Sequence, residues 1–279
     1  MGRMIGDRDL TAELVSVARE VATEAREFIV AGRQAAEVTA TKSSSVDIVT
    51  QMDIAAEALL RQRLFELRPA DGVLGEEGDA LEGTSGITWI VDPIDGTVNY
   101  LYGLPSFAVS VAAVRGKPTA HSWTALAGAV VDGHGDIWTA GNGMGASLNG
   151  KPLAVADPRP LGQTLLGTGF QYLAERRAVQ GQIAARLLPQ VRDIRRLGSA
   201  AIDLCLVASG RLDAYYEHGL NAWDFAAGAL IASEAGVKVA GLDGGPPDEH
   251  VVIAAHPTRW EELRDAVVDA GGTRPFAEI

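Results

Sequence analysis

The feature that most constrains this chain is an apolar run that ends in two closely spaced carboxylates. Trp89-Ile90-Val91 has the composition of a buried strand, and Asp92-Pro93-Ile94-Asp95 follows it at once. Two carboxylates held so close together repel each other unless a cation lies between them. Hard oxygen ligands of this type favour Mg²⁺ or a similar ion. The stretch therefore predicts a metal site at the point where a buried strand leaves its sheet.

The residues that follow predict a phosphate site beside the metal. Pro93 fixes its own backbone φ and leaves the Ile94 carbonyl as a further oxygen ligand. Gly96-Thr97 then stands at a predicted helix start, where backbone N–H groups can bind phosphate. A plain polar turn is the alternative, but crowding two carboxylates after a buried strand disfavours it. Metal and phosphate in one turn indicate an enzyme that acts on phosphate esters.

Composition narrows the partners of such an enzyme. The formal net charge of −12 argues against a nucleic-acid-binding surface, which needs clustered basic residues. It does not exclude an anionic substrate, because bound divalent ions reverse the local field. Cys205 is the single cysteine and lies in an apolar stretch. No internal disulfide can form, and we expect a buried structural thiol rather than a nucleophile.

The sequence carries no recognisable targeting or membrane-spanning segment. Residues 1–7 lack the apolar core of a signal peptide. No apolar run reaches the roughly 18 residues needed to span a bilayer. We therefore expect a cytoplasmic protein with no membrane partner.

Hydrophobic periodicity predicts helices and strands that interleave along the whole chain. Helices are expected over 9–31, 50–67, 175–188, 199–209, 224–235 and 257–270. Strands are expected over 73–74, 87–91, 107–114, 125–131, 136–140, 164–168, 212–216, 237–240 and 251–254. Residues 32–49 are polar and irregular, typical of a mobile loop or lid. Because no clean βαβ repeat emerges, the pattern favours a layered α+β fold. We expect an N-terminal α+β subdomain at 1–155 and a C-terminal α/β subdomain at 156–279, which form one integrated catalytic domain.

Three further acidic segments are candidates to complete the metal site. Glu76 lies in a Gly-Glu-Glu-Gly stretch after a short predicted strand, Asp53 lies near a helix start, and Asp224 opens another helix. Taken alone, each has a simpler interpretation: a solvated turn for Glu76, an exposed or dipole-favoured residue at a helix N-terminus for Asp53, and a helix N-cap for Asp224. An aspartate that caps a helix can still offer its second oxygen to a metal.

Together these motifs resemble the inositol monophosphatase family over nearly the full chain, and within it the bacterial SuhB-type branch. The family's Asp-Pro-Ile-Asp-Gly-Thr motif, with its preceding apolar run and following Asn-aromatic pair, stands at 89–100. Its Trp-Asp motif, which leads to Glu-Ala-Gly, stands at 223–236. Matching elements stand at 49–53, at 75–77 and within 195–217. The resemblance implies the αβαβα sandwich of the sugar phosphatases, a homodimer and inhibition by Li⁺.

The resemblance also implies the metal ligands. Glu76, Asp92 and the Ile94 carbonyl match the ligands of a first Mg²⁺. Asp92, Asp95 and Asp224 match those of a second, so Asp92 would bridge the two ions. A third, weaker Mg²⁺ is held in some members mainly through Glu76 and water, and Mn²⁺ is an expected substitute.

The same resemblance implies how substrate is held. Thr97 and Asp53 match a hydrogen-bonded pair that orients the nucleophilic water, and Gly96 with Thr97 matches the phosphate cradle. The positions that match contacts to the substrate, including its alcohol part, are Ile94, Asp95, Gly96, Thr97, Arg195, Ala200, Glu217 and Asp224. Lys42 matches a mobile-loop lysine near the metals. The histidines are scattered and are expected in structural or surface roles, with His218 a further candidate for the alcohol pocket.

The leading hypothesis is therefore a Mg²⁺-dependent phosphomonoesterase for myo-inositol monophosphate or a similar small polyol phosphate. Histidinol phosphate and fructose 1,6-bisphosphate remain alternatives within the family. The 3′-nucleotide bisphosphate branch is disfavoured, because it carries Lys where this chain has Val98. A different class of function is a regulatory partner of the transcription machinery, as SuhB-type proteins can be. The negative charge disfavours direct RNA contact there and permits a basic protein partner.

Overall fold

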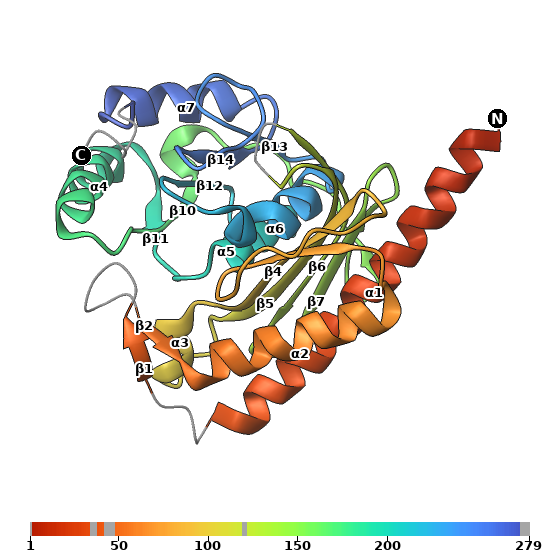
Figure 1. Ribbon diagram of the computed structural model, residues 1–279. Coiled ribbons are helices and arrows are strands. Elements are labelled where there is room, and N and C mark those ends of the chain that lie inside the picture. The colour runs from red at the N-terminus through yellow and green to blue at the C-terminus, as the bar shows by residue number, and fades with distance from the viewer. Residues whose placement is uncertain (1, 34–37, 42–47, 119–121, 274–279) are drawn as a thin grey trace.

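The computed structural model describes residues 2–33, 38–41, 48–118 and 122–273. Its helices and two sheets stack in layers (Figure 1). A seven-stranded sheet has the order β3-β4-β5-β6-β7-β8-β9, in which β3 and β4 are parallel and the other neighbours antiparallel. Its strands are β3 (Gly72–Gly75), β4 (Ile87–Asp95), β5 (Ala108–Gly116), β6 (Trp123–Asp132), β7 (Ile137–Gly141), β8 (Gly145–Leu148) and β9 (Lys151–Pro152).

Two long helices cover one face of this sheet. They are α1 (Gly2–Gly32) and α2 (Gln51–Leu67), and a short hairpin of β1 (Val38–Thr41) and β2 (Ile48–Thr50) lies beside them. Side chains on β5 alternate between the two faces, as expected for a buried strand. Val109 and Val111 pack with Leu14 and Leu60 of the helices, whereas Ala112 faces the opposite core.

The second sheet has five strands in the order β11-β10-β12-β14-β13. They are β10 (Leu165–Thr168), β11 (Asp193–Arg195), β12 (Ala214–Glu217), β13 (Lys238–Ala240) and β14 (Val252–Ala255). Its outer face packs against α4 (Ala174–Leu187) and α7 (Trp260–Asp269) through a separate core cluster that includes Ile183, Ile253 and Trp260.

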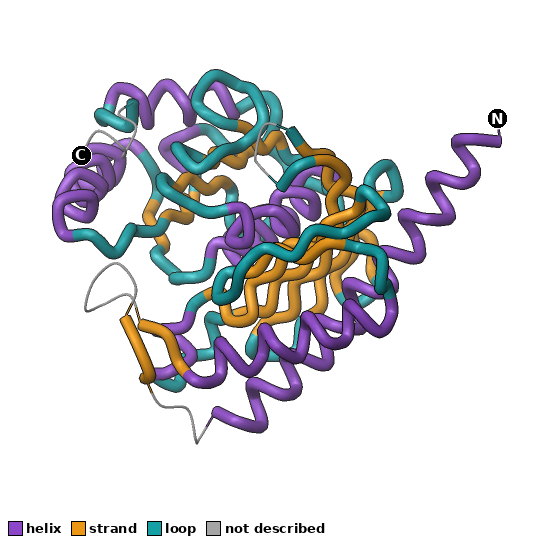
Figure 2. The backbone as a smooth tube through the Cα atoms, in the orientation of Figure 1, coloured by secondary structure: helices purple, strands orange, loops and turns teal. Residues whose placement is uncertain are grey.

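Two helices form the middle layer between the sheets. They are α5 (Ala200–Ala208) and α6 (Ala222–Glu234), shown in purple between the two orange sheets in Figure 2. One core cluster joins both halves of the chain across this layer, with Trp138 from the first sheet, Phe225 from α6 and Tyr215 from the second sheet. The order of layers is thus α, β, α, β, α, which confirms the predicted layered α+β sandwich.

The boundaries differ from the sequence prediction at several places. The helix predicted over 9–31 begins at Gly2. The segment predicted as an irregular loop over 32–49 contributes β1 and most of β2. The short strands β8, β9 and β11 were not predicted, because two to four half-polar residues carry too little periodicity to be recognised. The predicted subdomain boundary near 155 falls between β9 and β10.

Within the described residues, no helix combines the length and apolar character that crossing a bilayer requires.

Cys205 lies fully buried on α5, as predicted, and burial raises the pKa of its thiol well above the ordinary value.

Candidate active site

The Asp-Pro-Ile-Asp-Gly-Thr motif forms the end of β4 and the start of the short helix α3 (Thr97–Leu101). Asp92 was expected where the strand leaves its sheet, but β4 continues to Asp95, and its pairing with β5 is irregular between these two residues. Asp92 is buried, and its Oδ1 accepts the Ile94 N–H at 2.9 Å. Gly96 precedes α3 with φ at 96°, and a Cβ there would lie 2.8 Å from the Ser106 carbonyl oxygen. The turn therefore requires glycine.

The last residues of the motif fix this turn to its surroundings. Asn99 Nδ2 donates to the carbonyl oxygens of Ser106 and Leu197, both at 2.7 Å. Tyr100 is fully buried, and its hydroxyl donates to the Ile29 carbonyl of α1 at 2.7 Å. These bonds join α3 to α1 and to the segment that leads into α5, so both layers hold the turn in place.

Asp95 is held by the first turn of α5. Its Oδ2 accepts from Ser199 Oγ and from the Ala201 N–H, both at 2.7 Å. Burial raises the pKa of Asp95 to about 6, and the bonds from Ser199 and Ala201 oppose that rise. Ser199 is the N-cap of α5 and also accepts the Ile202 N–H at 3.3 Å. One serine thus caps a helix and orients a carboxylate.

Asp224 lies one turn further into its helix than the sequence suggested. Asn221 is the N-cap of α6, and Asp224 occupies the third helical position. Its Oδ2 accepts the Asn221 N–H at 2.6 Å in a capping box. The predicted N-cap role was therefore wrong, because Ala222 and Trp223 are already helical. The carboxyl still lies at the positive end of the helix, which favours its ionised form.

Asp53 is buried, with 1% of its surface exposed, so it is not an exposed residue, but it lies in the first turn of α2, where the helix dipole favours a negative charge, as the alternative interpretation expected. Its Oδ2 accepts the Thr50 N–H at 2.8 Å and the Thr50 hydroxyl at 2.5 Å at the start of α2. Its Oδ1 accepts from Thr97 Oγ1 at 3.0 Å, the pair that the family resemblance implied. Thr97 Oγ1 also lies 3.0 Å from the Ile94 carbonyl oxygen. The cap of α2 thereby fixes the Thr97 hydroxyl.

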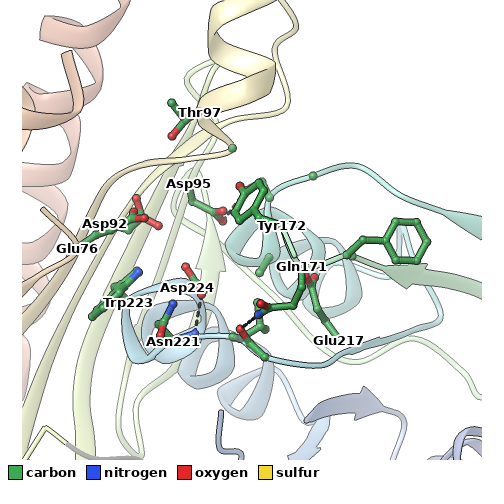
Figure 3. A pocket seen from close by; sticks show the side chains of 18 of the residues that line it. Glu76, Asp92, Asp95, Thr97, Gln171, Tyr172, Glu217, Asn221, Trp223 and Asp224 are labelled. Atoms are coloured by element: carbon green, nitrogen blue, oxygen red, sulfur yellow. Dashed lines mark hydrogen bonds between the residues drawn. The ribbon is translucent and has the colours of Figure 1, made fainter. Parts of the chain in front are cut away.

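These elements meet at a cavity of about 490 Å³ between the sheets (Figure 3). Its acidic wall is formed by Glu76, Asp92, Asp95 and Asp224, and Ile94, Gly96 and Thr97 also line it. Burial, followed by the charge of Glu76, raises the pKa of both Asp92 and Asp224 well above the ordinary value. Among the described residues, no three acidic, histidine or cysteine side chains converge closely enough to enclose an ion by themselves.

The opposite wall is formed by residues of the second sheet and of α5. Glu217, at the end of β12, and Ala200, at the start of α5, both line the cavity, as the resemblance implied. Tyr215 Oη donates to Glu217 Oε2 at 2.6 Å. A Cβ on Gly169 would lie 2.0 Å from Glu217 Oε2. Gly169 follows β10, the strand next to β12, and only a glycine there leaves room for the Glu217 carboxyl.

One predicted substrate contact lies elsewhere. Arg195 is exposed and pairs with Asp193 at 2.6 Å on the same face of β11. The next residue, Arg196, lines the cavity and lies across Gly198, where a Cβ would come within 2.4 Å of its Nη1. β11 ends at Arg195, so Arg196 is the first residue beyond the strand. Arg196, and not the predicted Arg195, is therefore the residue of this pair that lines the cavity. Lys42 lies outside the described residues.

Several lining residues were not singled out from the sequence. They are Phe170, Gln171, Tyr172, Arg176, Arg196, Glu249 and His250. Arg176 lies on α4 and the others lie on loops, and the fold brings them together from segments that are distant in the sequence. His218 is not among the lining residues: it is buried, and its Nε2 lies 3.0 Å from the Gly272 carbonyl oxygen. Its role there is structural, as the sequence suggested for the histidines in general.

The carboxyl of Glu217 makes a pH-dependent contribution to stability. Burial raises its pKa from 4.5 to about 7, against the opposing bond from Tyr215. A carboxyl whose pKa is higher in the folded than in the unfolded state destabilises the fold once it ionises. This penalty is absent below about 4.5 and complete above about 7.

We therefore expect Glu217→Gln to stabilise the metal-free protein progressively, relative to the unmodified chain, as the pH rises from about 4.5 to about 7.5. Urea denaturation in the presence of EDTA at several pH values measures this difference in unfolding free energy. A difference that stays constant with pH would show that Glu217 is ionised throughout in the folded protein.

Comparison of the whole chain with known proteins identifies its family. The model of the inositol monophosphatase family matches residues 10–270. This chain belongs to the inositol monophosphatase family. It is 43% identical to the inositol-1-monophosphatase SuhB of Mycobacterium tuberculosis, with 96% of this chain and 97% of that protein covered.

Structural comparison agrees with this assignment. The solved structure of Mycobacterium tuberculosis SuhB superposes with a TM-score of 0.80 at 44% identity, covering 94% of this chain and 98% of that one. The Nus factor SuhB of Escherichia coli is 40% identical over 75% of this chain and 77% of its own length. As a member of the inositol monophosphatase family the protein is a phosphatase, and the family is generally metal-dependent.

Proposed function

We propose that this phosphatase hydrolyses myo-inositol monophosphate or a similar small polyol phosphate with Mg²⁺ as cofactor. The observation that carries the proposal is the cavity with carboxylates from β4, α6 and the loop after β3 on one wall and Glu217 on the other. The relatives named inositol-1-monophosphatase support the substrate class.

The acidic wall fits divalent metal. Glu76, Asp92 and the Ile94 carbonyl would hold one Mg²⁺, and Asp92, Asp95 and Asp224 a second, while a third would depend on Glu76. Carboxylate and carbonyl oxygens are the donors that Mg²⁺ prefers, and Mn²⁺ accepts the same set. Burial is the main cause of the raised pKa of Asp92 and Asp224, and neutralising this wall would remove the further contribution of their acidic neighbours. When bound, the ions supply a more acidic water and neutralise charge on the ester oxygens.

The chain's own residues supply orientation. The N–H groups of Gly96 and Thr97 would receive the phosphate, and the Thr97 hydroxyl, fixed by Asp53, would orient the attacking water. Ala200 and Glu217 would contact the alcohol part, with Glu217 accepting a hydrogen bond from a substrate hydroxyl. Arg196 adds a positive charge to a cavity wall that is otherwise rich in carboxylates.

A steady-state screen tests this function. Purified protein with Mg²⁺ should show its highest kcat/KM with an inositol monophosphate among inositol, histidinol and fructose phosphates. EDTA in excess should lower turnover at least about 100-fold, since the carboxylate wall alone repels the substrate. A higher kcat/KM for histidinol phosphate or fructose 1,6-bisphosphate would identify that compound, and not an inositol phosphate, as the substrate. Full activity in EDTA would refute the metal-dependent chemistry.

A second candidate is a regulatory role in transcription, favoured by the similarity to the Escherichia coli Nus factor SuhB. The net charge of −12 suits a basic protein partner better than RNA.

We also propose, on the basis of the family assignment, that the protein forms a homodimer, is inhibited by Li⁺ and is located in the cytoplasm.

A further inference from the structure

Glu57 is a buried carboxylate outside the cavity that contacts the loop carrying Glu76. It lies on α2 with 2% of its surface exposed. Its Oε2 accepts the Glu77 N–H at 2.7 Å, and its Oε1 accepts the Gly78 N–H at 2.9 Å. These donors belong to the two residues that directly follow Glu76. The loop after β3 is therefore bonded to α2 through its backbone.

Arg61, one turn further along α2, completes this contact. Its Nε donates to Glu57 Oε1 at 2.8 Å, and its Nη2 donates to the Gly78 carbonyl oxygen at 3.1 Å. Glu57 and Arg61 together bind both an N–H and the carbonyl of Gly78. We call these two side chains the α2 clamp.

The glycines of the Gly-Glu-Glu-Gly stretch follow from the α2 clamp. A Cβ on Gly75 would lie 2.4 Å from the Glu57 carboxyl carbon. A Cβ on Gly78 would lie 2.9 Å from Glu57 Oε1 and 3.1 Å from Arg61 Nη2. Only glycine at these two positions leaves room for the α2 clamp between α2 and the loop. A turn surrounded by solvent would not need glycine at either position.

We propose that Glu57 and Arg61 are positioning residues that set metal affinity by holding Glu76 toward the other carboxylates. The inference rests on the proposed function, in which Glu76 binds metal. Glu57 is not itself placed as a ligand, because its two oxygens already accept from Arg61, Glu77 and Gly78. Each bond it makes fixes the backbone beside Glu76, while Glu76 itself lines the cavity.

The physical effect of the clamp is preorganisation. A loop ordered before the ion arrives loses less conformational entropy when it binds. Groups that orient metal ligands typically contribute a factor of about 10–100 to metal affinity. Removing the clamp should therefore weaken Mg²⁺ binding by that factor without changing which residues bind the ion.

The test measures Mg²⁺ binding to the full-length protein directly by isothermal titration calorimetry, with no substrate present. Glu57→Gln places an amide donor against N–H donors, so we expect an increase of about 10–100-fold in the Kd for Mg²⁺. Glu66→Gln is the matched control, since Glu66 lies on the same helix in an exposed pair with Arg63. Its Kd should equal that of the unmodified protein.

A double-mutant cycle separates positioning from a general effect on the fold. In a Glu76→Ala background, Glu57→Gln should weaken Mg²⁺ binding no further, because the clamp acts through Glu76. Gly78→Ala supplies a second route, since its methyl group disturbs the clamp while Glu57 stays intact; its Kd should rise in the same way. If Glu57→Gln fails to fold, the Kd of Gly78→Ala for Mg²⁺ tests whether the α2 clamp sets metal affinity.

Two results would overturn the inference. Unchanged Mg²⁺ affinity in folded Glu57→Gln or Gly78→Ala, beside normal binding by the unmodified protein, rejects the clamp and leaves the proposed function intact. Equal losses from Glu57→Gln with and without Glu76 assign Glu57 to general stability. Failure of the unmodified protein to bind Mg²⁺ would instead remove the proposed metal chemistry itself.

Discussion

Asp92→Asn is expected to lower kcat at least about 10³-fold, equivalent to about 4 kcal/mol of transition-state stabilisation. Asp92 is the carboxylate assigned to both metals, and it lies buried beside the charges of Glu76, Asp95 and Asp224. An asparagine keeps the Oδ1 acceptor for the Ile94 N–H and therefore the local turn. It removes the negative charge that would bridge two ions, so turnover should fall while the fold persists.

The same substitution should make the metal-free protein more stable at neutral pH. Burial and neighbouring carboxylates raise the pKa of Asp92, so its ionised form destabilises the fold above that pKa. Urea denaturation in EDTA and steady-state kinetics at saturating Mg²⁺ measure the two effects. Asp136→Asn, in the turn before β7, serves as the control and should change neither strongly. Turnover near that of the unmodified enzyme would contradict the bridging role.

Thr97→Ala should slow hydrolysis of every phosphate ester by roughly 10²–10³-fold, the range expected for the loss of one positioned hydrogen-bonding group at the reacting centre. Thr97 Oγ1 lies 3.0 Å from Asp53 Oδ1, within the motif that lines the cavity. Its role concerns the phosphoryl group and the water, which all substrates share. The loss should therefore appear in kcat for both inositol phosphate and p-nitrophenyl phosphate.

Thr97→Ser is the matched control for this prediction, because it retains the hydroxyl and the bond to Asp53. Its kcat should stay within about tenfold of the unmodified enzyme, since one hydrogen bond is preserved. A similar loss in the serine and alanine variants would assign the effect to the lost methyl group and its packing. A loss restricted to inositol phosphate would place Thr97 in alcohol recognition.

Local sequence predicted much of this architecture where the signal depends on neighbouring residues. The helix at 50–67 was predicted to within a residue, because its apolar spacing is periodic and Thr50 caps it. The long central strands β5 and β6 were also predicted, since each carries an extended buried run. Short strands such as β9 were missed, because their pairing partners, and not their composition, make them strands.

Other features depend on contacts between distant segments. Asp224 was taken as an N-cap, but Asn221 adopts the extended backbone that begins α6. Arg195 and Arg196 are adjacent in sequence, but Arg195 ends β11 and pairs with Asp193, whereas Arg196 follows the strand and lines the cavity. Glu57 gave no signal in the sequence, since its partners Glu77 and Gly78 lie some twenty residues away.

The sequence alone predicted the layered α+β class and the chemistry of the central turn, because Asp92, Asp95 and Gly96 stand in one short motif whose closely spaced carboxylates favour a cation. The tertiary structure alone decided which separate segments complete the site. It brings Glu76, Asp224 and Glu217 to one cavity from a loop, a helix and a strand end. Their convergence depends on how two sheets pack around α5 and α6, and that packing is a property of the whole buried core.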